Sequence, residues 1–303
     1  MNLVSIVTVN FDQPAVTEQL LQSIISCNDY PAIEVIVVDN GSRQDWTPDW
    51  QGRFPAFTFI RSEENLGFAG GNNLGIAAAR GDFYFLINND TEITAGLVGT
   101  LVRTLQSKPK IGIISPKILY AEDRHLIQYA GYTKMNFLTG RNRCIGQFET
   151  DRGQYDGVSG VTGYVHGAAM MVRKAAIEMT GLMDTNYFLY YEELDWAERI
   201  KKAGYELHVN LDAAIYHKES VSVGKRSALK EYFMTRNRIL FMRRHATGLA
   251  FLGFCAYYTL VVTPRNLLTY LKNGEYGFTK VFFRAIGWHF THKPDSPDLG
   301  YRP

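Results

Sequence analysis

The chain has 303 residues, of which 46% are hydrophobic and 20% are charged, with a net charge of +2. This composition is typical of a globular protein of one large or two small domains and excludes a low-complexity or disordered chain. The three cysteines, Cys27, Cys144 and Cys255, are widely spaced, which excludes a disulfide-built fold and indicates a reducing compartment. The N-terminus has no basic region followed by an apolar stretch, so we expect no signal peptide.

The N-terminal part of the chain predicts a strand–helix–strand unit. Residues 3–9 are β-branched and apolar and predict a strand that ends at Asn10. Residues 14–26 carry apolar side chains at helical spacing, and residues 34–38 predict a second buried strand that ends at Asp39. A connection of this length makes the two strands parallel, with a right-handed crossover.

A glycine-rich segment follows a third strand, which we predict at residues 57–60. The segment runs from Asn65 to Asn73 and precedes a helix predicted for residues 74–80. Its glycines let the backbone approach a ligand closely, and its amides could face a phosphate at the helix start. The order of the glycines is not that of a dinucleotide-binding or P-loop fingerprint. The alternative is a glycine-rich loop that packs tightly against the sheet.

The rest of the pattern is organised around a strand that ends in polar residues. Residues 83–87 are apolar and aromatic and predict a strand buried on both faces, followed directly by Asn88, Asn89, Asp90 and Thr91. In an open α/β sheet, ligands bind at the carboxyl ends of the strands. A carboxylate in that place is a candidate ligand for Mg²⁺ or Mn²⁺, which prefer oxygen donors. The alternative is an Asx turn that caps a helix starting near Thr91.

The middle of the chain is less regular. We predict a helix at residues 95–106, a short strand at 112–115 and a further apolar strand at 164–172. Residues 120–156 mix glycine, arginine, asparagine and aromatic residues. We interpret this segment as hairpins or long loops near an acceptor site.

An acidic cluster follows an aromatic run at residues 187–191. The run turns into a predicted helix that begins with Glu192 and Glu193 and includes Asp195. Acidic residues in a first helical turn stabilise the helix through its dipole. Burial beside the aromatic residues would instead raise the pKa of a carboxylate toward that of a useful general base. The local sequence leaves both interpretations open.

His217 ends a predicted strand at residues 211–218, as Asp90 follows the strand at 83–87. A histidine in this place is a second candidate metal ligand. A lone histidine is more often a hydrogen-bonded surface or core residue, so this alternative also stays open.

Together these segments resemble the family 2 glycosyltransferases with a GT-A fold, over residues 3–245. The resemblance rests on the motifs Thr8-Val9-Asn10, Val38-Asp39-Asn40-Gly41-Ser42, Asn65-x-Gly67-Phe68-Ala69-Gly70-Gly71-Asn72-Asn73, Asn88-Asn89-Asp90-Thr91, Glu192-Glu193-x-Asp195-Trp196 and His217. It implies an α/β fold over residues 1–245, with a Rossmann-like, mostly parallel sheet flanked by helices. Residues 246–303 would form a C-terminal helical extension and tail.

The resemblance also implies roles for individual residues. A nucleotide-sugar would be bound by Thr8, Asn10, Asp39, Asn40, Asn65, Gly67, Asn72, Asn73 and Asn89. Asp90 and His217 would hold Mg²⁺ or Mn²⁺, and Glu193 would be the catalytic base of a single, inverting displacement. The chain departs from the family pattern at Asn88, where the family usually has an aspartate, and at Glu193, which is one methylene longer than the usual aspartate.

A narrower resemblance concerns the donor. The segment 65–73 and the motif Tyr232-x-x-x-Arg236-Asn237 are similar to bacterial rhamnosyltransferases of cell-surface polysaccharide assembly. This similarity implies dTDP-L-rhamnose as the donor and a saccharide or lipid-linked saccharide as the acceptor. A UDP- or GDP-sugar is the alternative donor.

The C-terminal region is basic, with 14 Lys and Arg against five Asp and Glu from residue 218 to 303. Residues 233–245 predict a basic amphipathic helix, and residues 249–262 form an apolar segment that Pro264 ends. This segment is shorter than the roughly 18 to 20 residues that a spanning helix needs. It predicts a helix in the membrane interface, or one packed on the domain or on another subunit. We therefore expect a cytoplasmic protein, peripheral at the inner face of the cell membrane, with an oligomer as an open alternative.

Two other functions fit parts of the pattern. A sugar nucleotidyltransferase also has an α/β nucleotide-binding half, but its glycine-rich signature with Arg and Lys is replaced here by Asn10-Phe11-Asp12-Gln13. A nucleic-acid-binding protein would use the basic tail. The acidic body and the lack of a recognised motif argue against nucleic acid as a partner.

Overall fold

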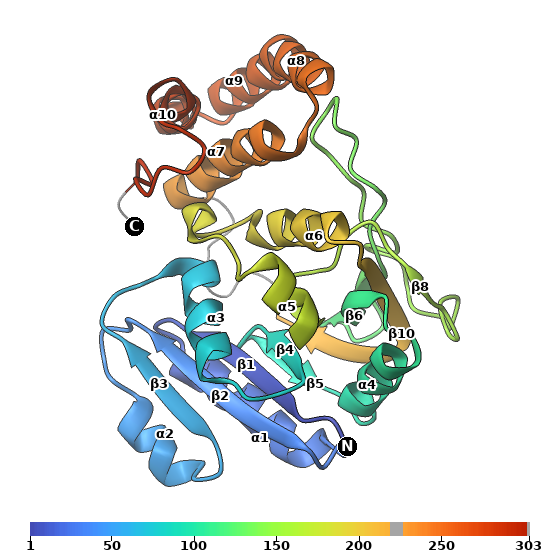
Figure 1. Cartoon of the computed structure of the whole chain (residues 1–303). Coiled ribbons are helices and arrows are strands. Elements are labelled where there is room, and N and C mark those ends of the chain that lie inside the picture. Colours follow the sequence, from blue (N-terminus) through green and yellow to red (C-terminus); the bar gives the residue numbers. More distant parts are fainter. Residues whose placement is uncertain (219–226, 302–303) are drawn as a thin grey trace.

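One mixed sheet runs through the protein (Figure 1). The computed structural model describes residues 1–218 and 227–301. In the described residues the strands are β1 (Val4–Asn10), β2 (Ile33–Asn40), β3 (Thr58–Ser62), β4 (Phe83–Ile87), β5 (Thr91–Ile93), β6 (Ile111–Tyr120), β7 (Ile127–Tyr129), β8 (Ser159–Val161), β9 (Ala169–Arg173) and β10 (Glu206–His217). They are ordered β3-β2-β1-β4-β9-β6-β10-β5, with β7 paired to β6 and β8 to β10.

The N-terminal half of the sheet is parallel, as the strand–helix–strand pattern predicts. β1 pairs with both β2 and β4 in parallel, and β2 pairs with β3 in parallel. β9 is antiparallel to both of its neighbours, β4 and β6, whereas β6 and β10 are parallel to each other. The carboxyl ends of β1, β2 and β4 therefore meet at one edge of the sheet, which confirms the predicted α/β class.

Helices cover both faces of the sheet. The helices are α1 (Pro14–Cys27), α2 (Thr47–Arg53), α3 (Gly67–Ala78), α4 (Leu97–Ser107), α5 (Lys174–Thr180), α6 (Glu192–Lys202), α7 (Ala228–His245), α8 (Gly248–Tyr257), α9 (Thr263–Lys272) and α10 (Tyr276–Thr291), with a short 3₁₀ helix at Thr185–Tyr187. Side chains of α1, α2 and α4 share one apolar core with the sheet. Side chains of α3, α5, α6 and α7 share the core on the other face.

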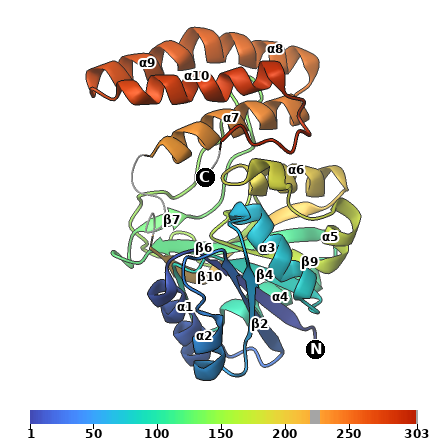
Figure 2. The same ribbon diagram turned by 90° about the vertical axis from the view of Figure 1, so that its left-hand side faces the viewer.

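The C-terminal helices form a layer that extends one side of the protein. Figure 2 shows α8, α9 and α10 beyond α7, on the side away from the sheet. A π-helical turn, Tyr258–Val262, joins α8 directly to α9. The expectation that Pro264 ends the helix is wrong. Pro264 lies in the first turn of α9, where the missing N–H group of a proline breaks no hydrogen bond of that helix. No helix in the described ranges combines the length and the apolar character required to cross a bilayer.

The irregular middle segment forms one long hairpin. Antiparallel bridges join Leu126 to Thr150, Tyr132 to Cys144 and Asn136 to Arg141. Its tip reaches the C-terminal layer, since Gly140 lies against Phe254 and Met242. The strand predicted for residues 164–172 is shorter than expected, because β9 begins only at Ala169.

Candidate functional site

A cavity of about 190 Å³ lies at the carboxyl ends of β1, β2 and β4. It brings together six of the predicted nucleotide- and metal-binding residues, namely Asn40, Asn65, Gly67, Asn72, Asn89 and Asp90. The apolar part of its wall includes Val9, Phe68 and Phe188. Three strand ends and the start of a helix thus converge on one concave site, as expected for an open α/β sheet.

The glycine-rich segment is the start of a helix and not a loop, which corrects the predicted helix start at residue 74. α3 begins at Gly67, whose φ of +71° and close approach to the Phe188 carbonyl leave no room for a side chain. Inside the helix, a Cβ on Gly71 would lie 2.8 Å from Val9 Cγ1. The glycines therefore let α3 lie close against β1, which agrees with the alternative of tight packing on the sheet.

A second layer of predicted residues lies beneath the cavity and does not line it. Asn10 and Asp39 are fully buried, and Asn10 Nδ2 donates to Asp39 Oδ1 at 3.0 Å. Asp39 Oδ2 accepts from Arg61 Nη1 at 2.6 Å. Thr8 is also fully buried, and its hydroxyl has no hydrogen-bond partner among the described residues. This network fixes the ends of β1 and β2 below the cavity.

Two asparagines have different surroundings. Asn89 lines the cavity, and its side-chain amide donates to Thr17 Oγ1 on α1 at 3.0 Å. Asn73 is not among the lining residues, because its amide group bonds both the carbonyl and the N–H of Met183. Asn73 thus joins α3 to the segment before α6.

Asp90 and His217 lie side by side at the edge of the cavity. Asp90 Oδ1 is 3.2 Å from His217 Nε2, and both side chains are buried. The helix predicted to start near Thr91 is absent, because residues 91–93 form β5, which pairs with β10 at His217. The helix-capping interpretation of Asp90 is therefore wrong.

Gln128 sets the orientation of the His217 ring. His217 Nδ1 lies 2.8 Å from Gln128 Oε1. An amide oxygen only accepts, so Nδ1 carries a proton and donates it to Gln128, which leaves Nε2 facing Asp90. Asp90 Oδ1 lies within ion-pair distance of His217 Nε2 but accepts no hydrogen bond from the described residues.

This donor pair fits a divalent cation that a ligand helps to bind. In the described parts of the chain, no group of three or more His, Cys, Asp or Glu side chains is arranged to hold a metal. Mg²⁺ sites commonly use one or two protein ligands and complete the shell with phosphate oxygens and water. The Asp90 carboxylate, which lines the polar cavity, matches that description, and His217 Nε2 lies 3.2 Å from it.

Glu192 and Glu193 begin α6 close to the cavity. Glu193 lies near Gly167 and Phe68, because a Cβ on Gly167 would be 3.8 Å from atoms of both. Burial raises the pKa of Glu193 above its ordinary value of 4.5, although N–H groups at the helix start act in the opposite direction. Burial and the neighbouring Glu193 carboxylate raise the pKa of Glu192 well above that value. Desolvation thus outweighs the helix dipole here, which favours the general-base interpretation.

The carboxylate of Glu193 is surrounded by aromatic residues and keeps a free oxygen. Its Oε2 has no hydrogen-bond partner within residues 1–218 and 227–301. Burial, with a smaller contribution from the charge of Glu193, raises the pKa of Tyr132, Tyr190 and Tyr191. A buried carboxylate with an unused oxygen can accept a proton from a hydroxyl group that enters the site.

The segment before Glu192 has an unusual backbone that α7 holds in place. Phe188, Tyr190 and Tyr191 have φ values of +59°, +69° and +75°. The Nδ2 group of Asn237 donates to the carbonyls of Tyr187, Leu189 and Tyr190 at 2.7 to 2.8 Å. Non-glycine residues adopt such angles only where the surroundings impose them. Asn237 therefore fixes the backbone that positions both glutamates.

The arginines of α7 do not form the predicted basic, solvent-facing stripe. Arg236 is fully buried and donates to the Asn186 carbonyl, while its guanidinium lies 4.0 Å from the Trp288 ring centre. Arg238 donates to the Thr139 carbonyl, and Arg244 forms an ion pair with Asp184. These cations join α7 to the segment before Glu192, to the long hairpin and to α10.

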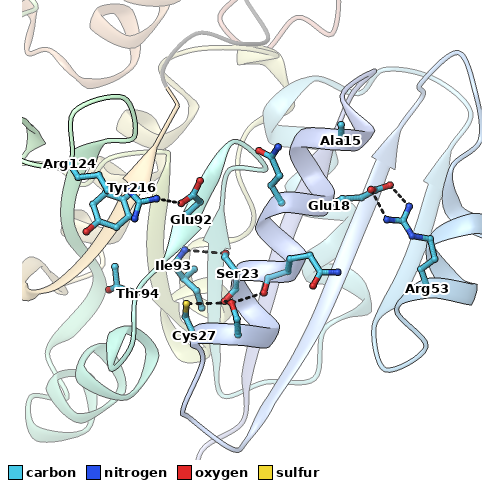
Figure 3. A pocket seen from close by; sticks show the side chains of 13 residues that line it. Ala15, Glu18, Ser23, Cys27, Arg53, Glu92, Ile93, Thr94, Arg124 and Tyr216 are labelled. Atoms are coloured by element: carbon cyan, nitrogen blue, oxygen red, sulfur yellow. Dashed lines mark hydrogen bonds and ion pairs between the residues drawn. The ribbon is translucent and has the colours of Figure 1, made fainter.

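A larger hollow lies on the other face of the sheet, beside α1. It has a volume of about 710 Å³, and Figure 3 shows Glu18 and Arg53 at one end with Glu92 and Arg124 at the other. Each of these two pairs forms an ion pair, with a distance of 2.7 Å between the arginine nitrogen and the glutamate oxygen. Its charged groups already have partners in the protein, whereas the smaller cavity adjoins two carboxylate oxygens, of Asp90 and Glu193, that accept no hydrogen bond from the described residues. The smaller cavity is therefore the better candidate site.

Four residues of the site were not predicted from the sequence: Arg61, Gln128, His166 and Asn237. The His166 ring lies 6.1 Å from that of His217, and burial together with His217 lowers the pKa of His166 to about 3. Gln128 and His166 are far from the recognised motifs, and only the hairpin and the turn before β9 bring them to the site. Asn237 was noticed as part of a motif, but its backbone contacts could not be read from the sequence.

Comparison with known proteins gives the site a context. Residues 5–179 match the family described as Glycosyl transferase family 2. The chain is 24% identical over 245 residues to the N-acetylglucosaminyl-diphospho-decaprenol L-rhamnosyltransferase of Mycobacterium tuberculosis, covering 74% of this chain and 78% of that protein. It is 25% identical over 250 residues to the uncharacterized protein y4gI of Sinorhizobium fredii, covering 80% of this chain but only 27% of that protein.

A solved structure shows the same fold. The mannosyltransferase PcManGT from Pyrobaculum calidifontis, in complex with GDP-Man and Mn²⁺, superposes with a TM-score of 0.58 at 16% identity. The match covers 95% of this chain and 87% of that one. At this identity the likeness establishes the fold and nothing finer.

Proposed function

The chain belongs to glycosyl transferase family 2 and has the GT-A fold, and we propose that it transfers a sugar from a nucleotide-sugar to a hydroxyl group with inversion at the anomeric carbon. The observation that carries this proposal is the half-buried Glu193 side chain, whose buried Oε2 has no hydrogen-bond partner among the described residues, beside a polar cavity that ends at Asp90 and His217. A base and a site for a charged leaving group on one cavity are the two requirements of such a displacement.

In the proposed mechanism, Glu193 accepts the proton of the acceptor hydroxyl as that oxygen attacks the anomeric carbon. The C–O bond to the diphosphate breaks on the opposite face, so the configuration inverts. The raised pKa supports this role, because a base works best when its pKa approaches the operating pH. The aromatic residues around Glu193 exclude water that would otherwise compete with the acceptor.

The cavity would hold the nucleotide-sugar. Asn40, Asn65, Asn72 and Asn89 line it with polar side chains, and Gly67 opens α3 at its wall. Thr8, Asn10 and Asp39 act from below by fixing the strand ends, and Asn73 acts by fixing α3. Asp90 and His217 would hold Mg²⁺ or Mn²⁺, which supplies positive charge for the departing diphosphate when it is bound.

We propose dTDP-L-rhamnose as the donor, with a UDP- or GDP-sugar as the alternative. The relative from M. tuberculosis, named as an L-rhamnosyltransferase, supports the first. A thermal-shift series with dTDP, UDP and GDP, each with and without Mn²⁺, tests the choice. Selective stabilisation by dTDP with Mn²⁺ is expected, and a larger shift with UDP or GDP would assign the donor to that nucleotide.

We further propose a saccharide or lipid-linked saccharide as the acceptor, and a cytoplasmic protein peripheral at the inner face of the cell membrane. The decaprenol in the name of the same relative supports a lipid-linked acceptor.

The substitution Glu193→Gln tests the reaction itself. It keeps the shape of the side chain but removes its basicity, so transfer should be abolished while the thermal shift with nucleotide stays unchanged. Full turnover by this variant would exclude Glu193 as the base.

A further inference from the structure

The outer face of the helical layer is unusually apolar. Nine of the 19 large hydrophobic side chains that are exposed in the described part of the chain lie between residues 248 and 291. Along α8 and α9 the exposed stripe consists of Leu249, Leu252, Ala256, Leu260, Leu268 and Leu271. The five leucines are between 55% and 85% exposed. A stripe of this size is not needed for the fold, because the opposite side of the same helix supplies the buried contacts of Phe254, Tyr258, Val262 and Tyr270.

The π-helical turn keeps this stripe on one face. From Leu252 to Leu268 its members recur every four residues, with the exposed Pro264 between Leu260 and Leu268. In a pure α-helix of 3.6 residues per turn, a four-residue repeat drifts steadily around the axis. The turn Tyr258–Val262 holds extra residues per turn and rotates the stripe back. The backbone irregularity and the apolar spacing therefore agree with each other.

The apolar surface continues onto α10. Tyr276, Phe283 and Phe290 follow at seven-residue intervals, which places them on one face of α10, and all three are exposed. A groove of about 400 Å³ between α8 and α10 is lined by Cys255, Thr259 and Phe290, among others. Because Phe290 both lines the groove and is exposed, the groove joins the two faces. We call this combined surface of α8, α9 and α10 the apolar platform.

The charges beside the platform indicate what it contacts. Arg265, Lys272, Lys280 and Arg284 are exposed, whereas Glu275 is the single acidic residue between positions 248 and 291. A second copy of the chain would bring the same four cations face to face. A bilayer with anionic headgroups would instead match both the apolar stripe and the positive charge.

We infer that the apolar platform docks onto the surface of a bilayer that contains anionic lipid. The leucines of α8 and α9 enter the boundary between headgroups and acyl chains, and the flanking cations contact the headgroups. The helices lie in the interface and do not span it. This inference deepens the peripheral location proposed above, but it concerns adsorption alone, so it can fail or hold independently of sugar transfer.

Vesicle co-sedimentation without donor or acceptor tests it. The wild-type protein should pellet with vesicles of phosphatidylcholine mixed with phosphatidylglycerol, and less with phosphatidylcholine alone or at high salt. The double substitution Leu252→Glu with Leu260→Glu should lower the affinity by about tenfold or more. Its matched control is Ile25→Glu with Met179→Glu, which adds the same charge at exposed apolar positions of α1 and α5 and should bind as the wild type does.

Each other outcome overturns the inference. Failure of the wild-type protein to bind the mixed vesicles at low salt would refute it, as would equal losses in the two double variants. Light scattering tests whether a second copy of the chain occupies the platform instead. The platform would be assigned to a second copy if the wild-type protein is a dimer that does not bind vesicles and the Leu252→Glu, Leu260→Glu variant is a monomer. All four positions are exposed, so unfolding temperatures should stay unchanged and exclude a folding defect.

Discussion

Replacing Asn237 by alanine should uncouple the catalytic base from the rest of the protein. The side chain is fully buried, and its Nδ2 group contacts three carbonyl oxygens just before Glu192. An NH₂ group has two protons, so the substitution removes two full hydrogen bonds and leaves buried acceptors unpaired. At about 1 to 3 kcal/mol for each, the free energy of unfolding should fall by about 2 to 6 kcal/mol.

The catalytic consequence follows from the backbone that Asn237 holds. The positive φ values of Phe188, Tyr190 and Tyr191 each cost of the order of 1 to 3 kcal/mol and persist only while the surroundings impose them. Without the contacts the segment relaxes and shifts Glu193. A displacement of about 1 Å at a reacting group costs on the order of 100-fold in rate. We therefore expect kcat to fall by about 10- to 100-fold, while the KM for the donor changes little.

The assay pairs steady-state kinetics with chemical unfolding, and Asn210→Ala is the matched control. Asn210 is also buried, and its side chain donates to Thr104 Oγ1 of α4 and accepts from Asp212 N, whereas the base lies on α6, which packs on the other face of the sheet. Its replacement should cost a similar amount of stability without changing kcat. An unchanged kcat in folded Asn237→Ala, or the same loss of kcat in both variants, would refute the positioning role.

Three further predictions concern the titrating and metal-binding groups. The pKa of Glu192 is raised in the folded protein, so the unfolded chain loses this proton at a lower pH. The free energy of unfolding therefore falls as pH rises from the ordinary glutamate range to the raised pKa. The fall is at most about 1.4 kcal/mol per pH unit. Glu192→Gln should reduce this fall in pH-dependent unfolding experiments and leave the smaller part that comes from Glu193; an unchanged slope would contradict it. The pKa of Glu193 is also raised, so kcat/KM should increase with pH through a value above 4.5 and then level off, and a limb at or below 4.5 would count against a buried base. Gln128→Leu removes the partner of His217 Nδ1 and should weaken Mn²⁺ binding, measured by calorimetry with dTDP present, by about 10- to 100-fold; wild-type affinity would show that Gln128 does not orient the ring.

The sheet and the general place of the site could be predicted from the sequence, because both follow from local rules. Apolar strands that stop on polar residues specify where a parallel sheet ends. Asn40, Asn89 and Asp90 therefore reached the cavity as expected. The pairing of β5 with β10, which brings His217 beside Asp90, is seen only in the structure.

Other features depend on contacts between distant segments and were predicted wrongly or not at all. The glycines of α3 look like a loop in sequence, but they allow a helix to lie against β1. Pro264 looks like a helix end, yet the preceding π turn lets the helix continue. The arginines of α7 look like a surface stripe, and only the fold shows that Arg236 is buried. The sequence around Gln128 contains no motif that indicates a role, because only the folding of the hairpin brings Gln128 to His217.

α7 connects the candidate base to the apolar platform through hydrogen bonds and packed side chains. On one side Asn237 holds the backbone before Glu192, and on the other Phe233 shares a core with Ala285 of α10. Arg243 also lies 3.2 Å from His289 of α10. A division of the chain near residue 245 stays a prediction. The contacts of α7 link the candidate base to the apolar platform whether or not such a division exists. If the platform rests on a bilayer, the height of Glu193 above the lipid is fixed by α7, and an acceptor anchored in that bilayer would reach the base from one direction only.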